Sequence, residues 1–321
     1  MALNIGRQGS VGVALQTGLD VPANPTDFAF YTDNKLAGKQ DTIENDGAYG
    51  IREKNFSSVA GKRWSEGEIG IYADSKMAGY FLVAAMGSVT VNSLGSSCYD
   101  HTISRNDSNQ PQLLSIISDR VVDKQLYPNC AVDELTLEVS DSLVKMSSKL
   151  KGYFPSTTTS GSITTTSGNL FSFKDAYFAF GSSPSQALAA GNLKPSSFKL
   201  TVKNNTDTSF RHGNNQPGSI DHKEFEVSAE TTVFFENTTQ RDLYYNSTKR
   251  STVFKLTGAG IGGGFSESLT VNFYQTHVET YEIETGLANF YAEKINIMAE
   301  YDNGNAKSVD MVLRNNKALY I

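Results

Sequence analysis

Alternation of apolar and polar side chains dominates this sequence. Apolar residues occupy every second position over six segments, in which the intervening residues are mostly charged, Ser, Thr or Asn. Successive side chains of a strand point to opposite faces, so this period of two is typical of antiparallel sheets with one buried and one solvated face. The segments are 134–140, 198–203, 224–235, 268–273, 294–301 and 309–313, and we expect the last two to pair through a turn at 302–305.

One segment, about 74–86, follows a helical period instead. Asp74 can accept the free amide hydrogens of the first turn, and Gly87 can adopt the left-handed conformation just past the end. At about 13 residues this helix is too short to span a bilayer, which needs about 20. It is apolar around almost its whole circumference, so it either runs through a large core or is covered by a second copy of the chain. The residues expected at such a subunit interface are Met77, Tyr80, Phe81, Val83, Ala84 and Met86.

The breaks in the pattern divide the chain into two comparable halves. A Ser/Thr/Gly-rich run at 156–168 is typical of a loop or linker between an N-terminal half, 1–155, and a C-terminal half, 169–321. The second half is either a continuation of the same fold or a second β domain. Two polar segments without strong strand signals, 33–59 and 204–219, predict long surface excursions.

Composition narrows the classes of function. The formal net charge of the 321 residues is -6, which argues against a protein that grips nucleic acid by neutralising its phosphates. Cys98 and Cys130 lack metal-site spacing and are expected to be two separate thiols in a reducing cytoplasm. Residues 1–12 hold no apolar signal core, and no stretch is long and apolar enough for a membrane anchor.

No catalytic, cofactor-binding or metal-binding pattern stands out. The four histidines have no shared metal-ligand spacing, and the glycines of 258–264 precede a strand pattern, which favours a hairpin tip over a phosphate loop. Carboxylates two apart, such as Glu66 with Glu68, could serve acid–base chemistry on a glycan. Without a neighbouring aromatic cluster they favour a solvated strand face, so we expect a protein that is not an enzyme and needs no cofactor.

The order of these parts resembles the tail tube proteins of long-tailed, siphovirus-like bacteriophages. The resemblance is one of layout over most of the chain, and it leaves 33–59 and 204–219 unaligned. The matching parts are the opening 5–18 with Pro22, Pro25 and the strand 27–31, the strand 66–73 feeding the helix 74–86, the middle segments 101–103, 112–119, 127–139 and 143–152, and the closing pair 290–301 and 308–315.

That resemblance implies a structural virion protein. Tail tube proteins are β-sandwiches flanked by a helix, and they form hexameric rings that stack into a hollow tube through which DNA is delivered to the host. The implied partners are further copies of the chain, the tape measure protein and the tail terminator or tip proteins. The implied location is the virion tail, assembled in the host cytoplasm. Segments 1–17 and 33–59 are the candidates for contact with the next ring.

A conduit for DNA must not bind it, so the resemblance implies an acidic lumen. The candidate lumen-facing acids come from the polar faces of two predicted strands, although the outer surface is an equally good location for those faces. They are Glu134, Glu138, Glu224, Glu226 and Glu230.

Other readings remain open from the sequence. A capsid decoration protein or the tube subunit of a type VI-like system would also be a β-rich, self-assembling structural protein. A β-rich glycan hydrolase or lyase would need a cleft with a carboxylate of raised pKa. An adhesin sandwich would be a monomer with an exposed aromatic patch. The sequence does not separate a contractile tail from a non-contractile one.

Overall fold

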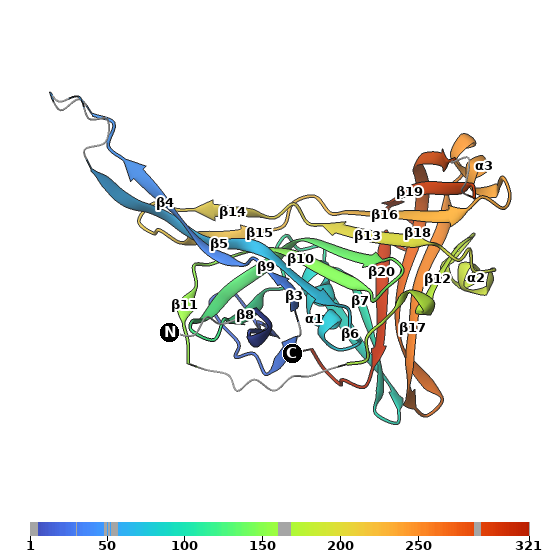
Figure 1. Cartoon of the computed structure of the whole chain (residues 1–321), viewed down its shortest axis with the longest axis horizontal. Coiled ribbons are helices and arrows are strands. Elements are labelled where there is room, and N and C mark those ends of the chain that lie inside the picture. The colour runs from blue at the N-terminus through green and yellow to red at the C-terminus, as the bar shows by residue number, and fades with distance from the viewer. Residues whose placement is uncertain are drawn as a thin grey trace.

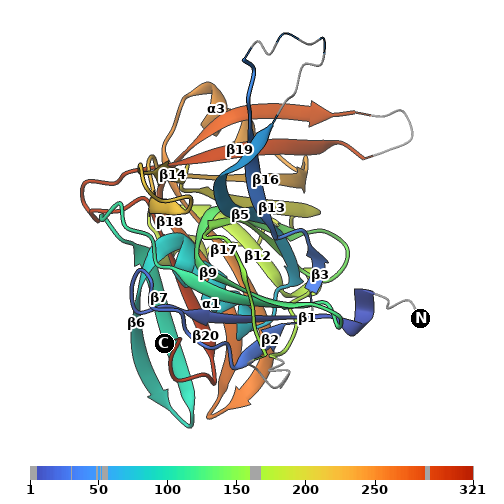
Figure 2. The ribbon, with the colours of Figure 1, turned by 90° about the vertical axis from the view of Figure 1, so that its left-hand side faces the viewer.

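The computed structural model describes residues 6–29, 31–47, 50, 52, 57–159, 168–285 and 290–320. Within them, antiparallel strands form three connected sheets around one buried helix (Figure 1). The prediction of a mainly β, antiparallel sandwich with a helix is therefore confirmed. Seen from the side, the strands enclose that helix, and hairpins project beyond them (Figure 2).

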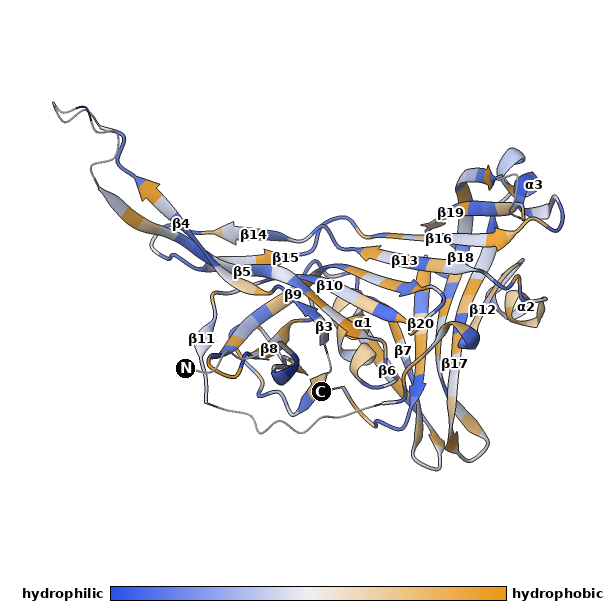
Figure 3. Ribbon diagram, viewed as in Figure 1, coloured by the Kyte–Doolittle hydropathy of each residue, from blue (hydrophilic) through white to orange (hydrophobic). Residues whose placement is uncertain are grey.

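The largest layer, which we call the long sheet, has the strand order β4–β5–β10–β9–β13–β16–β19–β18, with β3 also paired to β5. Its inward side chains are apolar and its outward ones polar, so the two colours of Figure 3 alternate along these strands. The strands are β3 Tyr31–Asn34, β4 Ala37–Glu44, β5 Ser58–Tyr72, β9 Lys124–Val139, β10 Lys145–Gly152, β13 Ser197–Lys203, β16 Glu226–Phe234, β18 Phe265–Glu284 and β19 Ala292–Glu300.

A second layer, the cross sheet, has the order β12–β17–β18–β20–β7–β6 and runs across the strands of the long sheet (Figure 1). Strand β18 belongs to both layers, because its first half pairs with β17 and β20 while its second half pairs with β19. The remaining strands of the cross sheet are β6 Gly87–Gly95, β7 Cys98–Arg105, β12 Ala176–Gly181, β17 Arg250–Gly262 and β20 Val309–Asn315.

A small sheet of order β2–β1–β8–β9–β11 completes the enclosure, and the first half of β9 connects it to the long sheet. Its other strands are β1 Ser10–Leu15, β2 Asp27–Ala29, β8 Leu114–Asp119 and β11 Ser156–Thr157. A separate hairpin and short helical elements lie outside these layers. They are β14 Asp207–Phe210, β15 Pro217–Asp221, α2 Pro184–Ala189, α3 Thr239–Tyr245 and the 3₁₀ turns Gly6–Gln8 and Phe173–Asp175.

Helix α1, Met77–Met86, lies between the sheets and contacts strands of all three. Both predicted end signals are confirmed. Asp74 Oδ1 accepts the backbone N–H groups of Lys76 and Met77 at 2.8 Å each, and Gly87, at φ 93°, donates its N–H to the Val83 carbonyl. The helix begins three residues later than predicted because these bonds place Asp74 ahead of the first turn.

All ten residues of α1 are buried within the chain itself. The six candidate interface residues, Met77, Tyr80, Phe81, Val83, Ala84 and Met86, are at most 5% exposed. The helix is apolar all round because it runs through a large core, which was one of the two alternatives. The expectation that these side chains face a neighbouring subunit is therefore wrong, since they have almost no surface left for a second copy.

The segment after β20 closes over the helix. Tyr320 is buried, and its ring fills the space beside Gly79, where a side chain would collide with it. Asn315 Nδ2 donates to the Tyr320 hydroxyl at 2.7 Å and to the Ser75 carbonyl at 2.6 Å. Lys317 pairs with Asp27 at 2.8 Å, so the last described residues are held to the core by packing and polar contacts together.

Four expectations need correction or limitation. Segments 33–59 and 204–219 are not irregular excursions, because they form hairpin strands β3, β4 and β14, β15. Strand β20 does not pair with β19; it lies between β18 and β7, although the 302–307 turn does form a bridge. Of the predicted linker 156–168, residues 156–157 pair with β9, and 160–167 lie outside the described residues. Strands of the two predicted halves, 1–155 and 169–321, share sheets, because β9 pairs with β13 in the long sheet and β7 pairs with β20 in the cross sheet.

Candidate assembly surfaces

The outward face of the long sheet carries rows of like charge on neighbouring strands. The acidic rows are Glu66 and Glu68 on β5, Glu134 and Glu138 on β9, and Glu226 and Glu230 on β16. The basic rows are Lys145 and Lys149 on β10 and Lys199 and Lys203 on β13, whereas β19 carries one charge of each sign, Lys294 and Glu300. Each basic row lies next to an acidic one, so the face is a lattice of alternating charge.

The strand register brings opposite charges directly together. Lys199 stands opposite Glu138 on one side and Glu230 on the other, and Lys203 stands opposite Glu134 and Glu226. Directly opposed side chains of one face lie about 4.5–5.5 Å apart at Cβ, and opposite charges there contribute roughly 0.2–1 kcal/mol. The lattice therefore stabilises the strand order as well as giving the face its electrostatic character.

Two ion pairs show the contact between opposite charges within the lattice. Lys149 Nζ lies 3.0 Å from Glu134 Oε1, and Lys294 Nζ lies 2.9 Å from Glu230 Oε1. The hydrogen bond from each lysine to its glutamate raises the pKa of that lysine above its ordinary value. Both lysines therefore stay charged at physiological pH.

Four of the five predicted lumen acids thus share one face, while Glu224 lies exposed in the turn before β16. The structure changes what they form together. They do not make a continuous acidic surface, because the lysines of β13 separate the two acidic strands and a second lysine row, on β10, borders β9 on its other side. The alternation in 198–203 already placed Lys199 and Lys203 on a polar face; what the sequence could not supply was the neighbouring strand.

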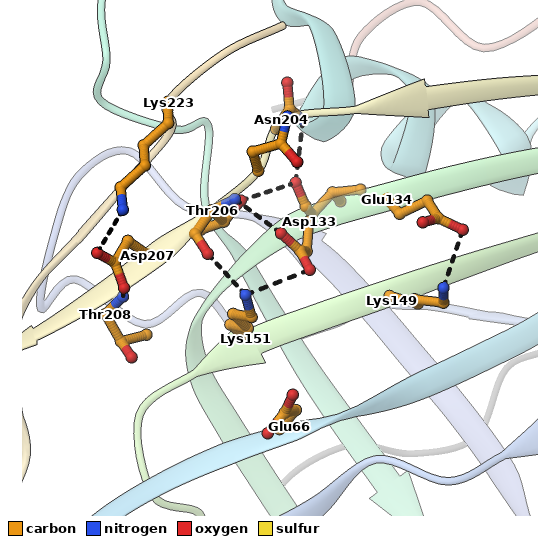
Figure 4. A network of polar contacts seen from close by, with 12 residues as sticks. Glu66, Asp133, Glu134, Lys149, Lys151, Asn204, Thr206, Asp207, Thr208 and Lys223 are labelled. Atoms are coloured by element: carbon orange, nitrogen blue, oxygen red, sulfur yellow. Dashed lines mark hydrogen bonds and ion pairs between the residues drawn. The ribbon is translucent and has the colours of Figure 1, made fainter. Parts of the chain in front are cut away.

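A polar network fixes the end of β13 to β9 and β10 (Figure 4). Asp133 accepts the Thr206 backbone N–H at 2.7 Å, and Lys151 reaches both the Asp133 carboxylate, at 3.3 Å, and the Thr206 carbonyl, at 2.6 Å. Beyond it, Lys223 pairs with Asp207 at 2.7 Å, and this pair lowers the pKa of the aspartate. The β14–β15 hairpin is thereby held at a defined place beside the long sheet.

Two edges of the long sheet are open among the described residues. Strand β4 pairs with β5 alone, and residues 277–284 of β18 pair with β19 alone. Unpaired strand edges present free backbone N–H and C=O groups, which natural proteins usually cover or pair. In this chain they are available for pairing with another chain.

The β4–β5 hairpin extends away from the rest of the molecule, and its outer part stands free of the sheets (Figures 1 and 2). Its base is braced by the β14–β15 hairpin. There the Trp64 and Phe210 rings meet edge to face at 6.2 Å, and the Arg63 N–H donates to the Asn215 carbonyl at 2.7 Å. Farther out, Ile43 and Val59 stand opposite each other and are 57% and 63% exposed.

The other predicted contact segment, 1–17, is less accessible. Residues 1–5 lie outside the described part of the chain, and β1 is the second strand of the small sheet, with Val11 and Val13 buried. Among the described residues of the two candidates for a contact between rings, those of the β4–β5 hairpin project from the body, whereas those of 6–17 do not.

Nothing in the described residues gathers the ligands of a metal ion, since no group of three or more His, Cys, Asp or Glu side chains is suitably placed. No helix there is long and apolar enough to cross a membrane. Cys98 and Cys130 are free and buried, and burial raises the pKa of Cys130 to about 12. Gly262, Gly263 and Gly264 form the β17–β18 turn with positive φ, as the hairpin-tip interpretation predicted.

Comparison with known proteins accounts for this architecture. Residues 3–302 match the family described as phage tail tube protein, which is a structural and not an enzymatic family. No curated protein matches the sequence. Because the match covers nearly the whole chain, the prediction of a structural, β-rich protein of the virion tail is confirmed. The chain belongs to the phage tail tube protein family.

Proposed function

We propose that copies of this chain form hexameric rings that stack into a hollow tube, through which phage DNA is delivered to the host. The rings assemble in the host cytoplasm, with the tape measure protein and the tail terminator or tip proteins as partners. The observation that carries the proposal is a long sheet with a polar outward face and an open strand edge at each end. Pairing of these edges between neighbouring copies would remove both of them.

In the proposed tube, the charged face of the long sheet lines the lumen. Lysines that would otherwise neutralise DNA phosphates are opposed by glutamates on neighbouring strands, as for Lys199 between Glu138 and Glu230. Binding of DNA through lysine releases counterions and is strengthened by each free cation. A lattice in which cations are already compensated gives a smooth, weakly interacting surface, and the overall charge of -6 adds net repulsion.

The first test is assembly itself. Electron microscopy of the purified, concentrated protein should show stacked rings with a channel wide enough for a DNA duplex. A protein that stays monomeric at all concentrations, alone and with its tail partners, contradicts the proposal.

The second test concerns the lumen. Glu226→Lys with Glu230→Lys removes the acidic row on β16, so tubes should still form but DNA ejection from assembled phage should slow, most strongly at low salt. Asp107→Lys with Glu236→Lys makes the same charge change at two exposed sites outside the strands of the long sheet and serves as the control. Equal ejection rates for the two variants would show that the charged face does not line the lumen.

A further inference from the structure

We propose that a polar cleft at the carboxyl end of α1 binds a neutral saccharide. The polar cleft lies between the small sheet, the loop 106–113 that joins β7 to β8, and the end of the β14–β15 hairpin. This carbohydrate-binding activity goes beyond the proposed tube. Its test uses the free subunit, so the outcome does not depend on whether tubes form.

The size and lining of the polar cleft suit a sugar. Its volume is about 310 Å³, near the lower end of the range for small-molecule sites, which is roughly 300–1,000 Å³. Exposed Leu19 and Pro111 add apolar surface. Sugar rings combine hydroxyl groups around their edge with apolar C–H groups on their faces. The lining side chains that both donate and accept hydrogen bonds include Gln16, Thr17, Asn106, Gln110, Gln112 and Ser219.

Charge argues against other classes of small ligand. Asp221 is the one charged side chain among the described residues that line the polar cleft. An anion such as phosphate would meet this carboxylate and no lysine or arginine, and a metal cation would gain only one negatively charged ligand. A single carboxylate also lacks the second acid that glycoside hydrolysis requires, so the polar cleft is suited to binding without turnover.

The chain leaves hydrogen-bonding groups of the polar cleft available to a ligand. The Asp221 carboxylate and the Gln110 amide make no hydrogen bond or ion pair with a described residue. Gln112 donates its amide N–H to the Gln16 carbonyl at 2.6 Å, which leaves its Oε1 oxygen as an acceptor. A carboxylate that accepts from two neighbouring hydroxyls, together with amides that donate and accept, can hold a sugar diol.

The loop that forms one wall is fixed from both sides. The Asn106 N–H donates to the Met86 carbonyl at 2.8 Å, at the end of α1. The His222 N–H donates to the Asn109 carbonyl at 2.8 Å, and the Asn106 side chain accepts the Ser108 N–H at 3.1 Å. A cleft that is already formed in the free chain binds its ligand without the cost of ordering its walls.

A smaller cavity of about 140 Å³ continues from the polar cleft. His222 lines this cavity, and its Nε2 atom is buried without a hydrogen-bond partner, whereas Nδ1 lies 3.0 Å from Thr206 Oγ1. Burial lowers the pKa of His222 to about 4, so the imidazole is neutral at physiological pH. Buried polar atoms without a partner are rare in folded proteins, and a hydroxyl of a second sugar unit would supply the missing partner. The two cavities share Gly87, Asn106, Ser108 and Gln110.

The charged residues around the smaller cavity do not make it an anion site. Arg105 pairs with Asp107, and Lys223 pairs with Asp207 at 2.7 Å, so each cation is compensated within the chain. The two cavities together therefore offer a neutral disaccharide room and hydrogen-bonding partners.

Saturation-transfer difference NMR of the purified subunit tests the proposal. The probes are four neutral disaccharides, maltose, cellobiose, lactose and diacetylchitobiose, and at least one should bind the wild type at millimolar concentration. Asp221→Ala should raise the dissociation constant of that disaccharide about tenfold, the loss expected for a hydrogen bond to a charged group. Asp141→Ala, at an exposed position between β9 and β10, is the control and should bind as the wild type does.

Filling the polar cleft provides a second measurement that does not depend on charge. A side chain built at Gly18 meets nothing within 4 Å, so Gly18→Leu should fold normally and occupy the polar cleft. Gly191→Leu is the matched control, because Gly191 is equally open and lines a different cavity. We expect Gly18→Leu to abolish binding of the disaccharide and Gly191→Leu to retain it.

Three results would overturn the inference. The first is that none of the four disaccharides binds the wild type. The second is wild-type affinity in either Asp221→Ala or Gly18→Leu. The third is that inorganic phosphate, measured in competition, displaces the disaccharide. Binding that both variants weaken, that both controls keep and that phosphate does not disturb supports the inference.

Discussion

Helix α1 and the β4–β5 hairpin place their apolar side chains in opposite environments. The helix holds ten consecutive residues that are all buried by the chain's own sheets, whereas the hairpin exposes Ile43 and Val59 on a polar ribbon. Both stand out in the sequence, one as too apolar for a surface and the other as too polar for a core. Only the helix is explained by the folded single chain.

The difference shows which parts of the sequence serve folding and which await a partner. Residues of α1 gain their stabilisation when one subunit folds, so their loss should appear in unfolding experiments on the free protein. In the proposed tube, residues of the hairpin would gain theirs on assembly, so their loss should have almost no effect on the free subunit.

The largest effect is expected for Phe81→Ala. Phe81 is fully buried at the centre of α1, and removing its ring costs both transfer free energy and a cavity. The free energy of unfolding should fall by about 3–5 kcal/mol, measured by urea denaturation of the unassembled subunit. A loss below that measured for a surface alanine substitution would show that α1 is not the centre of the core.

A smaller loss is expected for Tyr320→Phe. The variant keeps the ring beside Gly79 but removes the hydroxyl that accepts from Asn315 in a buried site. Leaving the Asn315 amide with one bond fewer should cost about 1–2 kcal/mol in the same denaturation experiment. Asn315→Ala in the Tyr320→Phe background forms the double-mutant control, and purely additive losses would contradict a direct interaction.

The pattern of alternation identified most core strands and both ends of α1, because these depend on local periodicity and capping. It could not identify which strand neighbours which. The pairing of β9 with β13 joins residues some sixty positions apart and sets Lys199 between two glutamates, a relation that no local pattern encodes. For the same reason β20 was assigned to β19, its neighbour in sequence, when it pairs with β18 and β7.

The hairpins were missed for a different physical reason. A strand can be recognised in the sequence by its alternation when one of its faces is buried. Strand β4 has no buried residue along its whole length, so it lacks that alternation. The sequence also made α1 a candidate interface because it could not show how many strands would surround it. An apolar circumference predicts burial, but only the fold decides whether the cover is intramolecular.

The end that carries α3 should show a pH dependence of its own. Glu293 on β19 is buried without a hydrogen-bond partner, and burial raises its pKa from 4.5 to about 7, although Arg241 on α3 opposes the shift; Tyr281 on β18 is the other ionisable group nearby. A raised carboxyl pKa means that the folded state binds the proton more tightly than the unfolded state. Stability from this group is complete below about pH 4.5 and is lost as the pH rises through 7.

Melting temperatures of the wild type and Glu293→Gln test this sign. The difference in favour of the variant should grow between pH 4.5 and about pH 7, where the unfolded state has released the proton that the folded state keeps, and should level off above that range. Glu226→Gln, an exposed position on the charged face, is the control. A constant difference between wild type and Glu293→Gln across that range would show that Glu293 is ionised, and compensated, throughout.

The smallest effect on the free subunit, and the sharpest contrast with Phe81→Ala, is expected for Ile43→Asp. Ile43 packs against no core residue, so the free energy of unfolding of the unassembled chain should stay within about 0.5 kcal/mol of the wild type. In tube assembly the same variant would place a carboxylate on the hairpin that is the candidate for contact with the next ring, and tubes should shorten or fail to form. Thr42→Asp, an equally exposed neighbour on β4, adds the same charge without removing the apolar side chain and should retain longer tubes than Ile43→Asp. If Ile43→Asp instead unfolds the free subunit, the hairpin belongs to the single-chain fold, and the contrast with α1 disappears.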